Sequence, residues 1–585
     1  MTKRRQSSSI IPTTSRPARR AGRRPVRAVL AAGLAGAILT ALIGGPAAAA
    51  AAPTRAEQTS GQFDLAPARP EPAVVRTDSG PVRGTVAADH RVFQGIPYAA
   101  PPEGPLRWQP PQPVTRWVEP RDATRPGPAC PQANGFLGDE PSITEDCLYL
   151  NVTTPTRRDG RDRPVLLWLH GGGFFSGSGH IYGSQRLATA GDVVVVTVNY
   201  RLGVFGFLAH PGLDGPNPDQ SSGNYGLQDQ QAALRWISRN IAAFGGDPGN
   251  VTVAGESAGA VSTCAHLAAP GSAGLFHRAV IQSGPCALTT QWPYLDGGNW
   301  VARPRAEAER MATGVLTALG CPVAPDAAAV ACLRREDPSS EDSSVERLLA
   351  ASNGGYGFGP VVGPGVLPVN PVEAIRTGRF NRVPVLHGTT RDEHITFQAA
   401  LEAMAGGQPT TEESYVAELT GFFGPERAAQ VLDRYPVSRY GSAGLAAATV
   451  WTDSAWACPA RTTNQLLSRH VPTYAFEFAD EQAPWFSAAP APTYPTGAFH
   501  AAELQYLFDD EQFPGPQTAD QRHLSDQMVR YWARFAHTGN PNGPGLPTWP
   551  RMSPASDRVQ VLAPGPGGIG QVDLGREHAC GFWRS

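Results

Sequence analysis

One serine in this chain stands in a context that could make it a nucleophile. Ser257 lies in Gly255-Glu-Ser-Ala-Gly259, directly after a β-branched run and directly before an alanine-rich stretch with a helical pattern. A serine between a strand and a helix is held on a strained turn, which needs small residues on both sides. The turn lifts the hydroxyl above the sheet edge, and the helix amides face any negative charge that develops there. The pattern predicts attack by Ser257 on a carbonyl carbon.

Three consecutive glycines follow another apolar run. The segment Pro164-Val-Leu-Leu-Trp-Leu-His-Gly-Gly-Gly-Phe174 is typical of a buried strand that ends in a turn without side chains. Glycines let backbone N–H groups approach a ligand oxygen closely, as an oxyanion hole requires. Taken alone, the segment could equally be a flexible turn. Its occurrence together with the serine motif favours the oxyanion hole.

These two motifs and several others together resemble the type-B carboxylesterases, the branch of the α/β-hydrolase superfamily that includes the cholinesterases. The resemblance extends from about Ala73 to Trp583. So many matches in one order are specific, and they imply an α/β-hydrolase fold that hydrolyses carboxylic esters. The further matching segments are Glu145-Asp-Cys-Leu-Tyr-Leu-Asn151, Asn199-Tyr-Arg-Leu-Gly203, Gly223-Asn-Tyr-Gly-Leu-Gln-Asp229, Asn240-Ile-Ala-Ala-Phe-Gly-Gly-Asp-Pro248, Phe276-His-Arg-Ala-Val-Ile-Gln-Ser-Gly284 and Asn540-Pro-Asn-Gly543.

A serine hydroxyl needs a base that takes its proton, and the base needs a carboxylate that orients it. In α/β-hydrolases the acid and then the histidine follow the serine along the chain. His500 has the most suitable context, after a proline-rich loop and before a helical pattern that begins at Ala501. The resemblance selects the same residue, through the pattern Gly-x-x-His-x-x-Glu. The other histidines considered precede Ser257, follow it too closely, or lie in helical and post-helical stretches: His90, His170, His180, His210, His266, His277, His470, His523 and His537.

Two adjacent carboxylates are candidates for the acid. Asp392 and Glu393 follow the predicted strand Val383–His387, and chemistry alone does not separate them from each other or from a solvated acidic pair. The resemblance selects Glu393, because the family has glutamate at the second position. The family then has glycine where this chain has His394, so we expect a more crowded loop around the acid.

The resemblance also assigns roles around this triad, and it implies an acyl-enzyme intermediate that water then hydrolyses. Three backbone amides would donate to the oxyanion: Gly172, Gly173 and Ala258. Three polar side chains would surround the triad, although each could equally be an ordinary buried polar residue: Glu256, Ser283 and Glu503.

A sheet buried on both faces must position these residues. Five short, continuous, β-branched runs predict its parallel strands: Val165–Leu169, Val193–Val198, Val251–Ala254, Ala279–Gln282 and Val383–His387. Helical patterns such as Gln228 to Ile241 lie between them, which predicts a doubly wound, mostly parallel α/β sheet with catalytic loops at its carboxyl edge. Residues 305–404 and 411–457 are mostly helical, and the resemblance makes them cap insertions of one domain, 73–585. An alternating stretch from Val74 to Gly84 predicts a hairpin.

The chain has eight cysteines, an even number that suits an oxidising compartment. The resemblance implies three disulfides: Cys130–Cys147, Cys321–Cys332 and Cys458–Cys580. Cys264 and Cys286 could form a fourth bridge or remain two buried thiols. The loop between Cys130 and Cys147 contains no tryptophan, whereas the longer cholinesterase loop has one that binds quaternary ammonium, so choline esters are not expected as specialised substrates.

The N-terminal stretch has the composition of an export signal. Residues 1–52 contain nine basic and no acidic residues, with an apolar run to about Gly45 and small residues after it. This predicts a signal peptide cleaved near Ala50–Ala52, with an uncleaved membrane anchor as the alternative. Arg23-Arg24 hints at twin-arginine export, although the residues around it fit that pattern poorly. Residues 53–72 are polar and rich in Pro and Ala, which predicts a flexible lead-in.

The net charge of the chain limits which kinds of partner we expect. Removing nine basic residues from the 49 leaves 40 against 51 acidic residues, a formal net charge near −11 for the mature chain. This balance argues against nucleic acid or an anionic membrane as partner. The sequence has no internal repeat and no His/Cys cluster with zinc spacing, so we expect no metal and no cofactor.

The sequence therefore predicts a secreted serine carboxylesterase whose partner is a small-molecule ester, with no stable membrane insertion after signal cleavage. A lipase-like hydrolase of longer-chain esters is the alternative within enzymes. A non-catalytic cholinesterase-like binding module is the alternative from another class, and the presence of all three triad residues argues against it. Acyl and alcohol preference and oligomeric state stay open at this stage.

Overall fold

A computed structural model describes residues 73–133, 140–156, 160–217, 220–288, 302–335 and 343–584. All of them belong to one compact unit, Arg69–Ser585. The predicted signal peptide and lead-in, residues 1–72, lie outside the described residues. Among the helices that the structure describes, none is both long and apolar enough to cross a bilayer.

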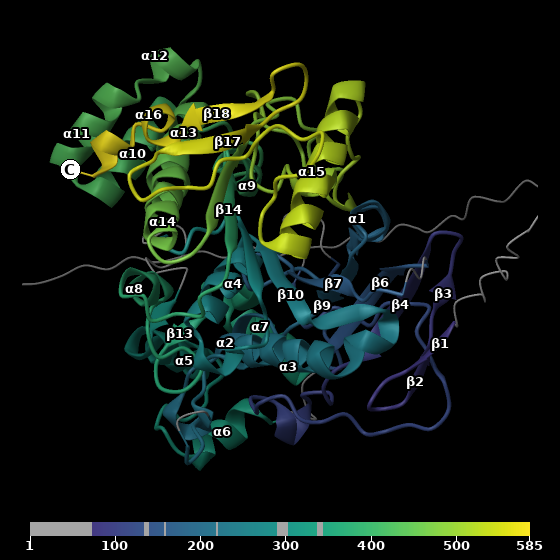
Figure 1. Ribbon diagram of the computed structural model, residues 1–585. Coiled ribbons are helices and arrows are strands. Elements are labelled where there is room, and N and C mark those ends of the chain that lie inside the picture. Colours follow the sequence, from purple (N-terminus) through teal and green to yellow (C-terminus); the bar gives the residue numbers. More distant parts are fainter. Residues whose placement is uncertain are drawn as a thin grey trace, which may run out of the picture. The chain divides into compact units, whose positions relative to one another are not determined.

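A sheet of eleven strands forms the centre of the described unit (Figure 1). Its middle strands are β7 (Arg163–Leu169), β9 (Val194–Val198), β10 (Gly246–Glu256), β11 (Arg278–Gln282), β14 (Val385–Thr390), β15 (Thr473–Phe478) and β17 (Arg558–Leu562). Its outer strands are β3 (Thr85–Val86), β4 (His90–Pro97), β6 (Tyr149–Pro155) and β18 (Ile569–Asp573). The order is β18-β17-β15-β14-β11-β10-β7-β9-β6-β4-β3, parallel from β17 to β9 and antiparallel outside. The predicted mostly parallel α/β sheet is confirmed.

The five strands predicted from continuous apolar runs all form, with shifted ends. β10 begins at Gly246 instead of Val251, and β14 runs from Val385 to Thr390 instead of ending at His387. Every residue of β7, β9 and β14 is buried, as expected for strands covered on both faces. The longer β14 brings the chain directly to the predicted acid.

Helices cover both faces of the sheet. The cluster on one face includes residues of α3 (Tyr225–Asn240) and α4 (Ala258–Ala268), and the cluster on the other includes residues of α15 (Ala519–Thr538). Successive side chains of β7 alternate between them, since Leu167 belongs to the first cluster and Trp168 to the second. Shorter helices are α1 (Gln185–Gly191), α2 (Gly203–Phe207), α16 (Leu574–Glu577) and α17 (Cys580–Trp583).

The predicted insertions are helical in large part. They contain α5 (Arg305–Ala318), α6 (Ala327–Leu333), α7 (Ser344–Ala351), α8 (Pro371–Arg376), α9 (Ile395–Met404), α10 (Glu412–Phe423), α11 (Pro425–Arg434), α12 (Val437–Tyr440) and α13 (Ala443–Trp451). The range 305–404 was too broad, because residues 353–370 form no α-helix and the range also contains β14 of the central sheet. A π-helix, Thr452–Ala457, continues α13 and leads into α14 (Cys458–Ser468).

Three small sheets lie beside the main one. The predicted hairpin forms, since β1 (Val74–Arg76) pairs antiparallel with β2 (Pro81–Arg83), and Thr77 Oγ1 donates to Gly80 O at 2.6 Å. β2 also pairs with β5 (Arg121–Asp122). The other two sheets join β8 (Tyr182–Gly183) to β16 (Asp509–Asp510) and β12 (Arg303–Pro304) to β13 (Val361–Val362).

The eight cysteines form four disulfides. Three are the pairs that the resemblance implies: Cys130–Cys147, Cys321–Cys332 and Cys458–Cys580. The fourth joins Cys264 on α4 to Cys286, which follows β11. Of the two alternatives left open for this last pair, the structure has the bridge.

Candidate active site

Ser257 lies on a sharp turn between β10 and α4. Its backbone has φ 53° and ψ −120°, a strained conformation for a residue with a side chain. The two glycines are required by close packing: a Cβ on Gly259 would lie 1.9 Å from Leu169 O, and one on Gly255 would lie 2.4 Å from the backbone of Gly259. Ser257 N donates to Gln282 O at 2.9 Å, which ties the turn to the end of β11. The turn thus presents the hydroxyl at the carboxyl edge of the sheet.

The glycine segment after β7 runs beside this turn. Gly172 and Gly173 have φ values of 95° and 60°, and Phe175 N and Ser176 N both donate to Gly172 O at 3.0 Å. Within the described part of the chain, the amides of the two glycines donate to no protein acceptor. Ala258 is the first residue of α4, where an amide has no intrahelical acceptor. These three N–H groups are therefore available for a substrate oxygen.

The structure separates the two candidate acids. Glu393 is fully buried, its Oε2 lies 2.5 Å from His500 Nδ1, and its Oε1 accepts from Thr390 N at 3.0 Å. Asp392 instead accepts from Ala498 N at 2.8 Å through its carboxylate and donates from its own N–H to Ala498 O at 3.0 Å. Glu393 is therefore the carboxylate that contacts the imidazole, whereas Asp392 joins the loop of Glu393 to the loop of His500.

The loop before His500 depends on one glycine. Gly497 has φ 56°, and a Cβ there would lie 2.5 Å from Asp392 Oδ2. Asp392 also forms a parallel bridge with Phe499. The glycine thus allows the loop to pass close enough for His500 to meet Glu393. The helical pattern predicted from Ala501 forms only a turn and a short 3₁₀ helix, Leu504–Tyr506.

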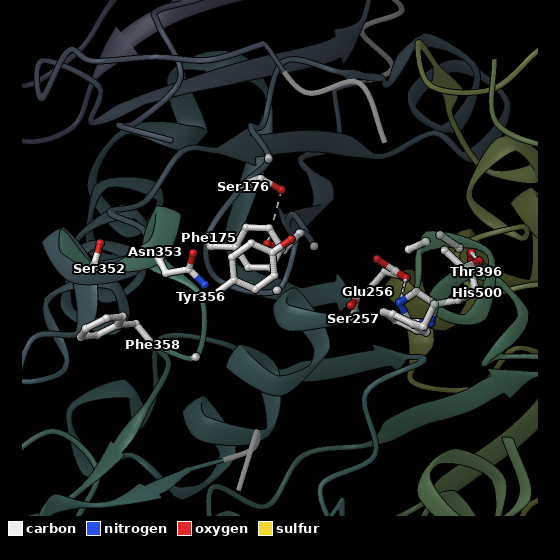
Figure 2. Close-up of a pocket in the computed structure, with 18 of the residues that line it drawn as sticks. Phe175, Ser176, Glu256, Ser257, Ser352, Asn353, Tyr356, Phe358, Thr396 and His500 are labelled. Carbon is white, nitrogen blue, oxygen red and sulfur yellow. Dashed lines mark hydrogen bonds and ion pairs between the residues drawn. The ribbon is translucent and has the colours of Figure 1, made fainter. Parts of the chain in front are cut away.

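The second imidazole nitrogen faces another carboxylate. His500 Nε2 lies 3.0 Å from Glu256 Oε1 (Figure 2), and the angles at this contact are not those of a hydrogen bond. No hydrogen bond joins Ser257 Oγ to His500 Nε2 in the described residues, although both line the same cavity. Hydrogen bonds between catalytic groups are often poorly aligned before substrate binds. A small movement of the imidazole toward Ser257 would complete the chain from carboxylate to nucleophile.

The other two polar residues implied around the triad are not joined to each other directly. Glu503 is fully buried, and its Oε1 accepts from Gln282 Nε2 at 3.0 Å. Ser283 is buried with φ 52°, and its N–H donates to Gly388 O at 2.8 Å. The Ser283 hydroxyl has no hydrogen-bond partner among the described residues. Glu503 does not contact Ser283; it acts on His500 through its charge, which raises the pKa of the imidazole.

Burial and charge act against each other at this site. Burial lowers the pKa of His500, but the carboxylates of Glu256 and Glu393 outweigh it and raise that pKa to about 9. Burial also raises the pKa of Glu256, and the positive charge of His500 opposes that rise. The cluster therefore favours a positive charge on His500, which is the charge that a general base acquires when it takes a proton.

His394, which stands where the family has glycine, is buried directly after Glu393 in the chain. Its backbone N–H donates to Thr452 Oγ1 at 3.0 Å, and Trp456 Nε1 donates to its Nδ1 at 3.4 Å. Burial, together with the charge on His500, lowers the pKa of His394 to about 3. His394 is therefore a neutral ring that fastens the acid loop to the π-helix.

A cavity of about 1230 Å³ opens from the candidate triad. Ser257 and His500 lie close together in its wall (Figure 2), the three glycines also line it, and much of the remaining wall is apolar. Phe175 and Tyr356 stack there with ring centroids 4.0 Å apart. Sequence reasoning missed the residues of this wall, because they carry no motif. Phe175 directly follows the glycine segment, and the others come from the insertions: Met311, Tyr356, Phe358, Phe397, Leu401 and Met404.

The mostly parallel sheet, with a serine on the strand-to-helix turn at its carboxyl edge, defines an α/β-hydrolase. Comparison with known families makes this specific. The model of the carboxylesterase family matches residues 71–583, so the chain belongs to that family. It is a carboxylic ester hydrolase.

Similar proteins occur in animals and bacteria. The chain is 34% identical over 490 residues to cocaine esterase of Oryctolagus cuniculus, covering 80% of this chain and 87% of the relative. It is 34% identical over 502 residues to para-nitrobenzyl esterase of Bacillus subtilis (strain 168), covering 84% and 94%. A solved structure of a thermophilic PNB esterase superimposes with a TM-score of 0.70 at 32% identity, covering 87% of this chain and 99% of that one.

Proposed function

We propose that this protein is a secreted serine carboxylesterase that hydrolyses small-molecule esters with Ser257, Glu393 and His500. One observation carries the proposal: His500 lies between the fully buried Glu393, at 2.5 Å, and the strained turn of Ser257, and both His500 and Ser257 line a large cavity. A carboxylate, an imidazole and a hydroxyl in that order are the groups that acyl transfer requires.

The first half of the reaction forms the acyl-enzyme. His500 Nε2 takes the proton from Ser257 as Oγ attacks the ester carbonyl carbon. The carbonyl oxygen becomes an oxyanion, which accepts hydrogen bonds from Gly172, Gly173 and Ala258. The C–O bond to the alcohol then breaks, and the alcohol leaves with the proton from His500.

The second half returns the enzyme to its starting state. His500 takes a proton from water, whose oxygen attacks the acyl carbon, and the same amides hold the second oxyanion. Ser257 leaves with the proton from His500, and the carboxylic acid is released. Glu393 keeps the imidazole in one orientation throughout and stabilises its charged form.

The cavity wall favours apolar esters. Aromatic and aliphatic side chains make up much of its lining, beside polar ones such as Arg303, Glu307 and Asn353, and two wall residues reach the outside, Met404 at 77% exposed and Tyr356 at 38%. An apolar mouth of this kind supports the longer-chain ester hydrolase as the second candidate. Two relatives are named for the compounds they act on, cocaine esterase and the pyrethroid hydrolase Ces2e of Rattus norvegicus.

Export and domain organisation remain part of the proposal. The four disulfides are compatible with an oxidising compartment, and a signal peptide over residues 1–52 would deliver the chain there. Residues 73–585 would then form one catalytic domain. Mass spectrometry of the protein from culture medium is expected to give an N-terminus near Ala50–Ala52, and retention of residues 1–52 would contradict the signal peptide.

The activity test uses p-nitrophenyl esters from acetate to palmitate, with the wild type and Ser257→Ala. Rapid turnover that is lost in Ser257→Ala is the expected result. A maximum at short, soluble esters identifies the esterase, whereas a rise above the solubility limit of long esters identifies the lipase-like alternative. If the wild type is no faster than Ser257→Ala, the proposed catalytic role of Ser257 is wrong, and the non-catalytic binding module becomes the better explanation.

A further inference from the structure

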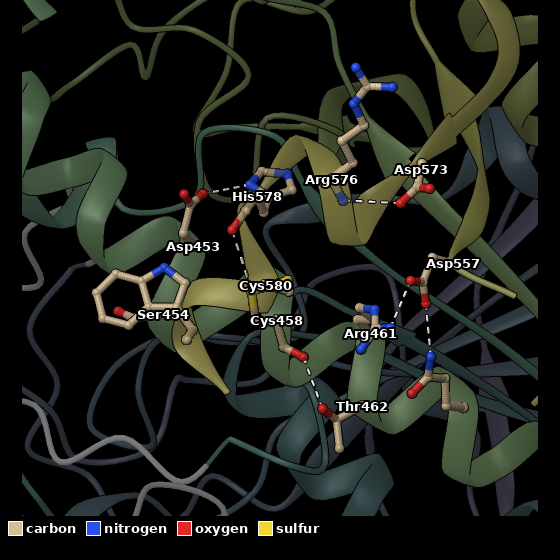
Figure 3. Close-up of a disulfide and its surroundings, with 12 residues drawn as sticks. Asp453, Ser454, Cys458, Arg461, Thr462, Asp557, Asp573, Arg576, His578 and Cys580 are labelled. Carbon is tan, nitrogen blue, oxygen red and sulfur yellow. Dashed lines mark hydrogen bonds and ion pairs between the residues drawn. A yellow bond between two sulfur atoms is a disulfide. The ribbon is translucent and has the colours of Figure 1, made fainter. Parts of the chain in front are cut away.

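A second buried histidine lies between two carboxylates, near the C-terminus. His578 Nδ1 lies 2.7 Å from Asp453 Oδ1, and His578 Nε2 lies 2.7 Å from Glu477 Oε1. All three residues are at most 5% exposed. Figure 3 shows His578 directed toward Asp453, beside the disulfide Cys458–Cys580. The reaction described above uses none of these groups.

Both carboxylates have further partners. Asp453 Oδ2 accepts from Tyr435 OH at 2.7 Å, and Glu477 Oε2 accepts from Arg391 Nε and Nη2, each at 3.2 Å. Arg391 also pairs with Glu481 and Glu577, whose side chains are exposed, unlike that of Glu477. His578 therefore bridges two acids that are each anchored elsewhere.

This network reaches both ends of the loop that carries the catalytic acid. At one end, Arg391 binds Glu477. At the other, His394 N donates to Thr452 Oγ1, on the same π-helix as Asp453. The path Arg391–Glu477–His578–Asp453–Thr452–His394 is thus a closed circuit around Glu393. π-helices are frequent at functional sites, and this one links the acid loop to the C-terminus.

The disulfide holds His578 in this circuit. Cys580 follows it by two residues, and Cys458 directly follows the π-helix, 122 positions earlier in the chain. The bridge therefore pins the segment that carries His578 to the segment that carries Asp453. Without His578, the two buried carboxylates would face each other across a gap with no cation between them.

We propose that His578 is a positioning residue for the catalytic acid: by closing the circuit, it fixes the loop Arg391–His394 and keeps Glu393 aligned with His500 Nδ1. The inference rests on the proposed function, because it assigns a task relative to the proposed triad. Burial lowers the pKa of His578, but the hydrogen bonds to Asp453 and Glu477 outweigh it and keep the imidazole charged. The other charged and titratable groups in or next to the circuit are Arg391, Asp392, Glu393, His394, Tyr435, Glu481 and Glu577.

The test compares His578→Gln with His523→Gln in the full-length enzyme. His523 is exposed on α15, so its replacement controls for loss of an imidazole. We measure kcat and KM on p-nitrophenyl acetate per active site, with active sites counted by an organophosphate titrant. His578→Gln is expected to lower kcat roughly 10- to 100-fold with KM unchanged, because small misplacements of catalytic groups cost rates of that order. An unchanged kcat per active site would overturn the inference.

The pH profile gives a readout that a merely structural role would not move. If Glu393 is displaced, it stabilises the charged imidazole of His500 less, and the pKa of His500 falls. The acid limb of kcat/KM is then expected at lower pH in His578→Gln than in the wild type or His523→Gln. A lower melting temperature with an unmoved acid limb would mean that His578 only stabilises the fold.

Thr452→Val provides a second variant in case His578→Gln does not fold. It removes the hydroxyl that accepts from His394 N, at the far side of the circuit, and leaves His578 unchanged. We expect the same fall in kcat and the same shift of the acid limb, both smaller. If neither changes in Thr452→Val, the circuit does not position the acid.

Ser257→Ala, assayed in parallel, separates this inference from the proposed function. A Ser257→Ala variant as active as the wild type would contradict the proposed triad and the inference with it. An inactive Ser257→Ala beside a fully active His578→Gln would contradict the role of His578 alone.

Discussion

His500 and His578 are both buried, and each lies between two carboxylates, yet the two sites are built for different tasks. His500 has Glu393 at 2.5 Å and Glu256 at 3.0 Å, and His578 has Asp453 and Glu477, each at 2.7 Å. Both imidazoles have a raised pKa for the same reason, since the neighbouring carboxylates outweigh burial. Composition and charge therefore do not distinguish them.

The difference lies in what each second nitrogen meets. Both nitrogens of His578 make hydrogen bonds, and its two acids bind Tyr435 and Arg391 in turn, so the ring has no freedom to exchange a proton. The ring of His500 makes a hydrogen bond only through Nδ1 among the described residues, while its Nε2 has no hydrogen-bond partner there and the residue lines a cavity together with Ser257. A buried histidine between acids becomes a candidate base when one nitrogen stays uncommitted and substrate can reach it.

The largest contrast is expected from replacing one glutamate of each site. Glu393→Gln should lower kcat by about 10³- to 10⁴-fold with little loss of stability, because the amide leaves the imidazole without its orienting charge. Glu477→Gln should instead cost about 3 kcal/mol of unfolding free energy, because it leaves buried cations without their partner. Rates of ester hydrolysis and urea unfolding of both variants measure these effects. Equal losses of activity in the two variants would contradict the different roles of the two sites.

Removal of the C-terminal disulfide is expected to affect the His578 site selectively. Cys458→Ser with Cys580→Ser opens a bridge between residues 122 positions apart, which typically costs about 2–5 kcal/mol. Thermal unfolding should show this loss, and kcat per active site should fall less than in His578→Gln. Cys321→Ser with Cys332→Ser, which opens a bridge between residues only 11 apart on the insertion, is the matched control. An equal effect from both pairs would argue against a special role for the C-terminal bridge.

A smaller effect is expected from Glu256→Gln, and it is measured in the pH dependence of kcat/KM. The carboxylate of Glu256 helps to raise the pKa of His500 to about 9, so kcat/KM of the wild type should rise with pH toward that value. A neutral amide no longer stabilises the imidazolium, and the acid limb should move to lower pH. Glu307→Gln, on the cavity wall, should leave the limb in place. An unmoved limb in Glu256→Gln would show that this carboxylate carries no charge when the base titrates.

The smallest effect concerns how the stability from His578 depends on pH. Because the folded protein raises the pKa of His578, its contribution is fully present below the usual histidine pKa and is lost as pH rises through the folded value. The difference in unfolding free energy between the wild type and His578→Gln should therefore shrink at alkaline pH. Urea unfolding at pH values from about 6 to 10 measures it, and a difference that grew with pH would contradict a charged His578.

Much of the fold and part of the site could be predicted from local patterns. Continuous β-branched runs marked the middle strands, because a strand covered on both faces must be apolar at every position. Ser257 was recognisable because a strained turn between strand and helix tolerates only glycine at its close contacts. The loop context and the resemblance singled out His500 in the same way. The ends of β10 and β14 were missed, because hydrogen bonding to neighbouring strands extends them beyond the apolar run.

Only the tertiary structure decided which residues meet. Asp392 and Glu393 are equivalent in sequence, and the path of β14 and the Ala498 contact direct just one of them toward His500, 107 residues away. The bond between Cys264 and Cys286 depends on the packing of α4 against the end of β11. His578 carried no motif, because its two acids lie 125 and 101 residues away. The sequence determines each strand and turn through interactions among near neighbours, whereas contacts over a hundred residues exist only once the sheet has set the distances.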